Sequence, residues 1–219
     1  MLRESYREEL DDINACLVEM SNSVGSAMST ATTALLDADV ALADLVIAGD
    51  ERIDAVRESI EERCFTLLAR QQPVATELRT ITTAMRIVSD LERMGDLAVH
   101  IAKVARMRFP EHAVPQEVRP ILLDAGHVAE SLVTKAGTVI AKRDVEAAAE
   151  LEAEDDVMDQ LHKELFRELL SDDWPHGIES AIDITLLGRY YERFADHAVS
   201  VARRVVYLVT GERPSTLLS

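Results

Sequence analysis

The stretch SDLERMGDLAVHIAKVA, residues 89–105, carries two patterns on one predicted helix. Its apolar residues, together with Ile87, recur with alternating steps of four and three, which is the spacing of a helix that buries one stripe against its neighbours. Glu92 and Asp96 lie one turn apart on another face, where two carboxylates repel each other. The first pattern predicts a helix of a bundle, and the second pattern requires a reason for the unfavourable pair.

Both patterns occur twice in the chain. Residues 189–205, RYYERFADHAVSVARRV, repeat the stripe and the acidic pair at an offset of 100. Residues 37–54 align with residues 142–159 at an offset of 105, and each of these segments carries its own pair of aspartates four residues apart. Because internal repetition is the signature of a duplicated structural unit, the chain is expected to contain two similar units in tandem.

Apolar residues at helical spacing cover almost the whole chain, and no segment alternates with the period of a strand. We therefore predict an all-α protein of six helices, arranged as two tandem, pseudo-two-fold-related three-helix bundles at residues 1–110 and 111–219. The segment 108–120, which contains three prolines, is the expected linker between them. The second unit is expected to have the shorter loop before its last helix. The predicted breaks between helices are residues 37–39, 71–75, 108–120, 142–144 and 171–177.

The chain has 219 residues and a net charge of −17. Such a field repels phosphate backbones and anionic lipids, so we expect cations or basic partner surfaces as ligands, and neither nucleic acid nor a membrane surface. No stretch is long and apolar enough to predict a membrane span, and the N-terminus lacks the apolar segment of a signal peptide. Cys16 and Cys64 lie far apart without a CxxC motif, which predicts two reduced thiols in a cytosolic protein.

Four matched acidic pairs with the pattern D/E-xxx-D are the candidate site residues, two pairs in each repeat. One pair alone is explained as a solvated helix face with local ion pairs, such as Arg93 with Asp96, but four pairs in register favour a shared purpose. Clustered carboxylates suit hard cations such as Mg²⁺, Ca²⁺, Mn²⁺ or iron, so we expect an open, multinuclear metal site near the surface of each half. The expected ligands are Asp50, Asp54, Glu92 and Asp96 in the first half and Asp155, Asp159, Glu192 and Asp196 in the second.

The sequence indicates no other chemistry. The histidines have no matching histidine in the other repeat, and His162, for example, aligns with Arg57, so we expect the histidines to be surface residues. The Glu-x-x-His motif of di-iron carboxylate bundles does not occur, which argues against a ferritin-like oxidase. The sequence also lacks a GxSxG motif and a glycine-rich phosphate loop, and we expect no catalytic residues.

Taken together, RIVSDLERMGDLAVHIAKVA (86–105), YYERFADHAVSVARRV (190–205), AGDERID (48–54) and AEDDVMD (153–159) closely resemble the PhoU family of bacterial phosphate-signalling proteins. The resemblance covers about residues 5–212 and implies two similar three-helix bundles. It also implies that the eight carboxylates bind multinuclear clusters of divalent or ferric ions, with Fe, Mn, Mg or Zn as candidates. The second repeat departs from the family pattern at Tyr191 and Ala195, where leucine and glycine are more usual, and altered packing is expected there.

The resemblance implies a function without catalysis. PhoU-like proteins are cytoplasmic negative regulators of the phosphate-starvation response. They are expected to connect the high-affinity phosphate ABC transporter, through its ATPase subunit, to a membrane-bound sensor histidine kinase. Association with the membrane through these partners alone, and a homodimer, are expected. Two alternatives stay open: a metalloenzyme that uses the clusters for hydrolysis or redox chemistry, and a coiled-coil scaffold whose acidic residues only keep it soluble.

Overall fold

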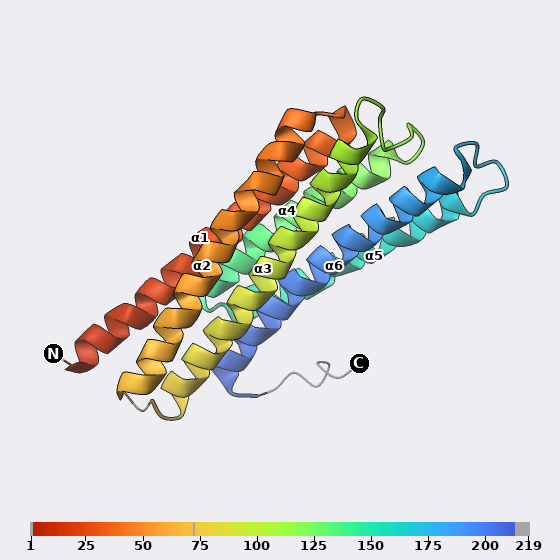
Figure 1. Cartoon of the computed structure of the whole chain (residues 1–219). Coiled ribbons are helices and arrows are strands. Elements are labelled where there is room, and N and C mark those ends of the chain that lie inside the picture. The colour runs from red at the N-terminus through yellow and green to blue at the C-terminus, as the bar shows by residue number, and fades with distance from the viewer. Residues whose placement is uncertain (1, 72, 213–219) are drawn as a thin grey trace.

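The computed structural model describes residues 2–71 and 73–212, and these residues form six α-helices and no strand (Figure 1). The all-α prediction is confirmed, and the helices begin and end at or near the predicted breaks. None of the six described helices combines the length and the apolar character needed to cross a membrane. The helices are α1 (Leu2–Asp37), α2 (Val40–Gln71), α3 (Thr76–Arg108), α4 (Arg119–Lys142), α5 (Val145–Leu169) and α6 (Gly177–Thr210).

The second half is shorter in a helix and not, as predicted, in a loop. Helix α5 ends at Leu169, which aligns with Cys64, whereas α2 continues to Gln71. The connection from α5 to α6, residues 170–176, is longer than the segment 72–75 between α2 and α3. The prediction failed because an alignment offset locates a deletion between two segments without telling helix from loop.

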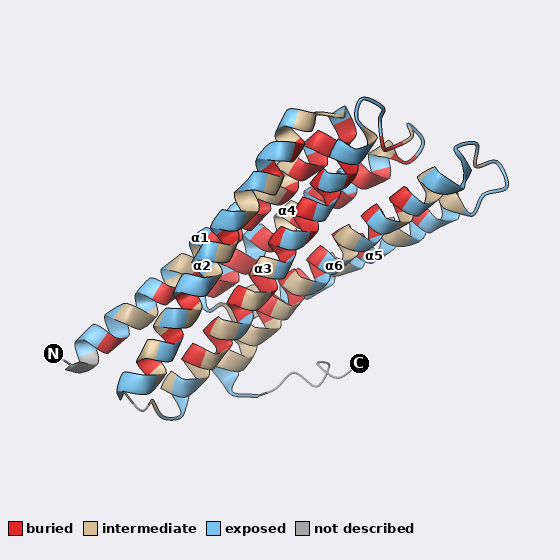
Figure 2. Ribbon diagram, in the orientation of Figure 1, coloured by how far each residue is buried: buried red, intermediate tan, exposed pale blue. Residues whose placement is uncertain are grey.

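The two three-helix bundles, α1–α3 and α4–α6, lie side by side, as predicted. Helix α3 packs against α6, α1 packs against α4, and α2 and α5 take the outer positions. The order α2, α3, α6, α5 therefore runs across one face of the molecule, and α1 and α4 lie behind it (Figure 1). The buried apolar side chains of both bundles form one continuous core (Figure 2). A domain boundary near residue 110 remains a prediction.

The predicted apolar stripes face this core. All the stripe residues of α3 from Ile87 to Ala105 are buried, and so are those of α6 from Leu187 to Val205. Tyr191 in this stripe is fully buried, and its hydroxyl lies 2.8 Å from Thr32 Oγ1 of α1, close enough for a hydrogen bond between the two bundles. A phenol in place of the leucine thus adds a satisfied polar link inside the core.

The contact between α1 and α4 contains the same packing arrangement twice. A Cβ added at Gly137 would lie 2.4 Å from Ser21 Oγ, and a Cβ added at Gly126 would lie 2.5 Å from Thr32 Cγ2. In the repeat, Ser21 aligns with Gly126 and Thr32 aligns with Gly137. The molecule therefore has an internal pseudo-two-fold axis, and at each copy of the contact a hydroxyl-bearing residue of α1 packs directly on a glycine of α4.

Matched aspartates begin the outer helices. Asp39 accepts hydrogen bonds from the backbone N–H groups two and three residues later, at 2.9 and 3.0 Å, and Asp144 accepts the corresponding bonds at 3.0 and 3.1 Å. These side chains satisfy amide donors that have no partner within the helix. This matched pair of acids is therefore explained by helix capping, unlike the D/E-xxx-D pairs farther along the same helices.

Charged residues fix the register of α3 against α6. Arg204 Nε donates to Asp90 Oδ2 at 2.5 Å, and His197 Nδ1 lies 3.2 Å from Asp90 Oδ1. Burial alone would raise the pKa of Asp90, but the hydrogen bonds to His197 and Arg204 hold it below its usual range. Farther along the contact, Arg108 Nε donates to Asp183 Oδ2 at 2.6 Å. Sliding one bundle along the other would leave these buried acids without partners.

The close approach at Gly137 leads to a stability prediction. Gly137→Ser forces its new Cβ into Ser21, and overpacking of this kind costs about 1–3 kcal/mol. Exchanging the two residues, Ser21→Gly with Gly137→Ser, restores one hydroxyl-bearing residue facing one glycine, so most of the lost stability should return. Thermal unfolding followed by circular dichroism measures both effects.

Gly49→Ala is the matched control, because a Cβ added there meets no atom within 4 Å. That variant should gain up to about 1 kcal/mol from helix propensity alone. A Gly137→Ser protein as stable as the wild type would contradict the described packing of α1 on α4.

Candidate metal centre

The four predicted ligands of the first half come together where α2 and α3 lie side by side. Asp50 and Asp54 are half-buried on α2, and Glu92 and Asp96 stand on the facing side of α3. Gly95 allows the close approach, because a Cβ added there would lie 3.8 Å from Asp50 Oδ1 and in tight contact with Ile53. The groups form an acidic cluster at the rim of the core, as the prediction of an open site required.

The carboxylates of this cluster lie close enough to repel one another. Burial, followed by the charges of Asp96 and Asp54, raises the pKa of Asp50. Burial and the charge of Asp96 likewise raise the pKa of Glu92, although the nearby Arg57 opposes the shift. The ionised carboxylates therefore destabilise one another in the absence of a cation.

The second half repeats the arrangement between α5 and α6. Burial, together with Asp196, Asp159 and the adjacent Asp156, raises the pKa of Asp155 to about 6. Burial and the charge of Glu192 raise the pKa of Asp196. All eight predicted residues thus fall into two sets of four, one in each half, and the α3–α6 contact separates the two sets.

A basic side chain faces the glutamate of each set, and sequence reasoning missed this feature. Arg57 Nε lies 3.8 Å from Glu92 Oε1, and His162 Nδ1 lies 3.6 Å from Glu192 Oε2. His162 is not the surface residue we expected, since its side chain is 19% exposed. The available signal was its alignment with Arg57, which puts both residues three positions after an aspartate of the D/E-xxx-D motif.

Each of the two basic residues also has one nitrogen that makes no hydrogen bond within the described residues. Within the described part of the chain, Arg57 Nε and His162 Nε2 are buried and make no hydrogen bond. The imidazole of His162 could serve as a nitrogen ligand, whereas the guanidinium of Arg57 cannot, because it keeps its proton. The two sets are therefore chemically different although their carboxylates match.

The donor set fits a hard multivalent cation in chemistry and in charge. Each half offers carboxylate oxygens from two packed helices, and a bound cation would relieve the repulsion among them. Within residues 2–71 and 73–212, no three acidic, histidine or cysteine side chains converge closely enough to chelate one ion as they stand. Binding would therefore require side-chain rotation of the carboxylates, which lie at the surface of rigid helices.

Replacement of Asp155 tests the repulsion in metal-free protein. The pKa of this group rises from its ordinary 3.8 to about 6 on folding. The folded state holds the proton more tightly, so stability falls as pH rises through this interval and remains lower above it. Asp155→Asn should therefore stabilise the protein at pH 7, by about 1 kcal/mol after allowance for solvent screening, and should have little effect near pH 4.

Thermal unfolding in a chelator, at pH values from about 4 to 8, measures the difference between variant and wild type. Asp124→Asn on α4 is the control, because Asp124 is exposed and lies outside both sets. A stabilisation by Asp155→Asn that is equally large at every pH would contradict this origin.

Comparison with known proteins finds the same domain family in both halves of the chain. The PhoU domain matches two segments, residues 17–105 and 122–205, one in each half. The chain is 48% identical over 213 residues to "Phosphate-specific transport system accessory protein PhoU homolog 2" of Mycobacterium tuberculosis, which covers 97% of this chain and 100% of that protein. It is 34% identical to the PhoU homolog of Pseudomonas aeruginosa, with 96% of this chain and 87% of that protein aligned.

Two solved structures share the fold. The crystal structure of PhoU from Pseudomonas aeruginosa superposes with a TM-score of 0.88 at 33% identity and covers 94% of this chain and 100% of that one. The structure of the phosphate transport system regulatory protein PhoU from Streptococcus pneumoniae gives a TM-score of 0.86 at 27% identity, with coverages of 96% and 99%. Since the domain matches in both halves and the relatives align over most of their length, this chain belongs to the PhoU family.

Proposed function

We propose that this protein is a regulatory accessory component of a phosphate-specific transport system and acts by binding, without catalysis. One observation carries the proposal: the chain aligns over nearly its whole length with proteins named as accessory proteins of that system. The names of these relatives describe accessory or regulatory proteins and no enzymatic activity.

A protein that acts only by binding can change a partner by favouring one of its conformations. We infer that the partners are the ATPase subunit of the phosphate ABC transporter and a membrane-bound sensor histidine kinase, whose phosphatase state is favoured when phosphate is plentiful. The long helices of the described chain supply rigid docking faces. The net charge of −17 favours basic partner surfaces and speeds their association.

The two sets of carboxylates are the proposed sites for divalent or ferric ions, with Fe, Mn, Mg or Zn as candidates. A bound cluster would supply positive charge that neutralises the acids. The chain's own part is to hold two carboxylates on each of two packed helices, with Arg57 beside one set and His162 beside the other. Because His162 is a possible nitrogen donor, the second set is the one suited to softer ions such as Zn²⁺.

We further propose that this protein is cytoplasmic and reaches membrane complexes through its protein partners. We also propose that it forms a homodimer.

Deletion of the gene tests the regulatory role. Without the protein, phosphate-starvation genes should stay expressed when phosphate is abundant, because no adaptor favours the kinase's phosphatase state. Transcript levels at high and low phosphate measure this, and re-expression of the intact chain is the control. Unchanged repression at high phosphate, in cells without a second copy of such a gene, would contradict the adaptor role.

Loss of one carboxylate in each set tests the metal sites. Asp96→Asn and Asp196→Asn should each lower the metal content of the purified protein, and the double variant should lose nearly all of it. Asp96→Asn should change stability by no more than about 0.5 kcal/mol, because Asp96 is exposed, and Asp196→Asn should not destabilise the protein, because burial and Glu192 raise the pKa of Asp196. Elemental analysis measures metal content, with Asp124→Asn as control; a double variant with normal content would exclude these ligands.

A further inference from the structure

One pair of matched surfaces breaks the symmetry of the repeat. On the outer helix α2, three glutamates precede an exposed phenylalanine within two turns. At the aligned positions of the outer helix α5, the residues are basic or apolar. The acidic patch consists of Glu58, Glu61, Glu62 and Phe65, which align with Lys163, Phe166, Arg167 and Leu170 of the basic patch.

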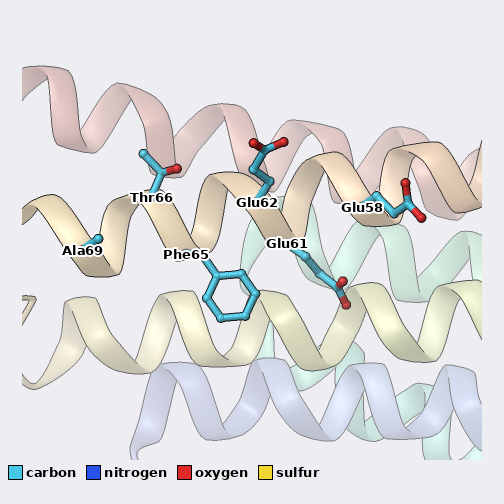
Figure 3. A pocket seen from close by; sticks show the side chains of 6 residues that line it. All are labelled: Glu58, Glu61, Glu62, Phe65, Thr66 and Ala69. Carbon is cyan, nitrogen blue, oxygen red and sulfur yellow. The ribbon is translucent and has the colours of Figure 1, made fainter.

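The acidic patch is open to solvent along α2. Its members line a shallow surface hollow, in which Phe65 and Glu61 project toward α3 and Glu62 projects to the opposite side (Figure 3). Phe65 is 58% exposed, a large fraction for an aromatic side chain. Arg57 pairs with Glu61 at 3.2 Å and more distantly with Glu58, while Glu62 has no ion pair within residues 2–71 and 73–212. The patch therefore keeps an excess of negative charge around an apolar centre.

The basic patch carries two cations and a larger apolar part, and the exposed Glu164 and Glu168 lie on the adjoining flank of α5. Leu170 is 81% exposed and Phe166 is 37% exposed. Lys163 and Arg167 are exposed and form no ion pair with any described residue. The neighbouring helix α6 adds an exposed stripe of Ile178, Ile182 and Leu186, which lines a hollow of its own. The aligned residues of α3 are mostly polar and are Leu78, Thr82 and Arg86.

We propose that these two patches bind each other between two copies of this chain, the acidic patch of one copy against the basic patch of its partner. Each patch combines exposed apolar side chains with charged ones, as protein interfaces do, and the charged residues of the two patches have opposite signs. The inference deepens the proposed homodimer by naming its surface.

The internal pseudo-two-fold axis allows this contact to form twice in one dimer. That axis relates α2 to α5, which run in opposite directions at the two outer positions, so the two patches lie toward opposite ends of the molecule (Figure 1). A second copy laid face to face across a perpendicular two-fold axis puts its basic patch on the acidic patch and its acidic patch on the basic one. Both contacts form at once in a closed dimer, as the symmetry of an isologous interface requires.

Local complementarity has to overcome a general repulsion, because each copy carries a net charge of −17. Salt screens the attraction between the patches and also the repulsion between the whole molecules, so a salt titration does not test the pairing. Charge reversal does, because it changes the sign of one patch and the two reversals move the net charge of −17 in opposite directions, so a loss of association in both proteins is not explained by general repulsion. The same net charge disfavours nucleic acid or an anionic membrane as the occupant of the basic patch.

The experiment uses two reversed proteins. The first carries Glu58→Lys with Glu62→Lys, and the second carries Lys163→Glu with Arg167→Glu. Each protein alone should dimerise at least about tenfold more weakly than the wild type, because both of its contacts then join patches of like sign. An equimolar mixture should form a heterodimer of near wild-type affinity, because both of its contacts again join opposite signs. Sedimentation velocity over a range of concentrations, in a chelator, measures the association.

Glu150→Lys and Lys142→Glu are the matched controls, because both residues are exposed and lie outside the patches; they should leave the association unchanged. A monomeric wild-type protein would overturn the proposal, and a basic protein bound to the acidic patch of that monomer would then be its occupant. Dimers that survive either reversal would also overturn it. The regulatory role is measured independently by phosphate-responsive transcription, so failure here leaves that role standing.

Discussion

The close packing of α1 on α4 is the constraint on which the other features depend. Two glycines of α4 let a hydroxyl-bearing residue of α1 approach the helix backbone, once at Ser21 and once at Thr32. This double contact holds the inner helices antiparallel about the pseudo-two-fold axis and brings α3 against α6. Because the core is then shared between the halves, α2 and α5 take the outer positions. The side of each outer helix that faces solvent can therefore carry charged residues.

The acidic sets follow from that arrangement. An outer helix packed on a neighbour along one stripe presents its flanking positions at the rim, where carboxylates are half-buried or exposed and lie close to those of the next helix. Desolvation and crowding then act together, which is why the pKa of Asp155 rises to about 6. Rigid helices cannot separate to relieve the repulsion, which protonation or the proposed binding of a cation would reduce. The strain in the metal-free sets thus arises from the same packing that stabilises the fold.

Periodicity predicted the helices, the tandem bundles and the pairing of the acids, because spacing along a helix determines which side chains share a face. The sequence contains no comparable pattern that predicts contacts between helices far apart in the chain. Nothing in the sequence distinguishes Asp90 from the other acidic residues, yet it is buried against His197 and Arg204. The lack of a matching histidine predicts a surface position for His162, but the arginine at the aligned position makes the corresponding contact. The shortening of α5 was also assigned to the wrong element.

The hydrogen bonds of Asp90 have a mechanical consequence. Asp90 stands two residues before Glu92 of the first set, and His197 directly follows Asp196 of the second. The contact between them fixes the distance between the two acidic sets, because neither helix can slide or rotate without losing a buried hydrogen bond. A partner that touches both sets therefore meets two concentrations of charge at one constant separation, and only a surface with the same spacing can engage them together.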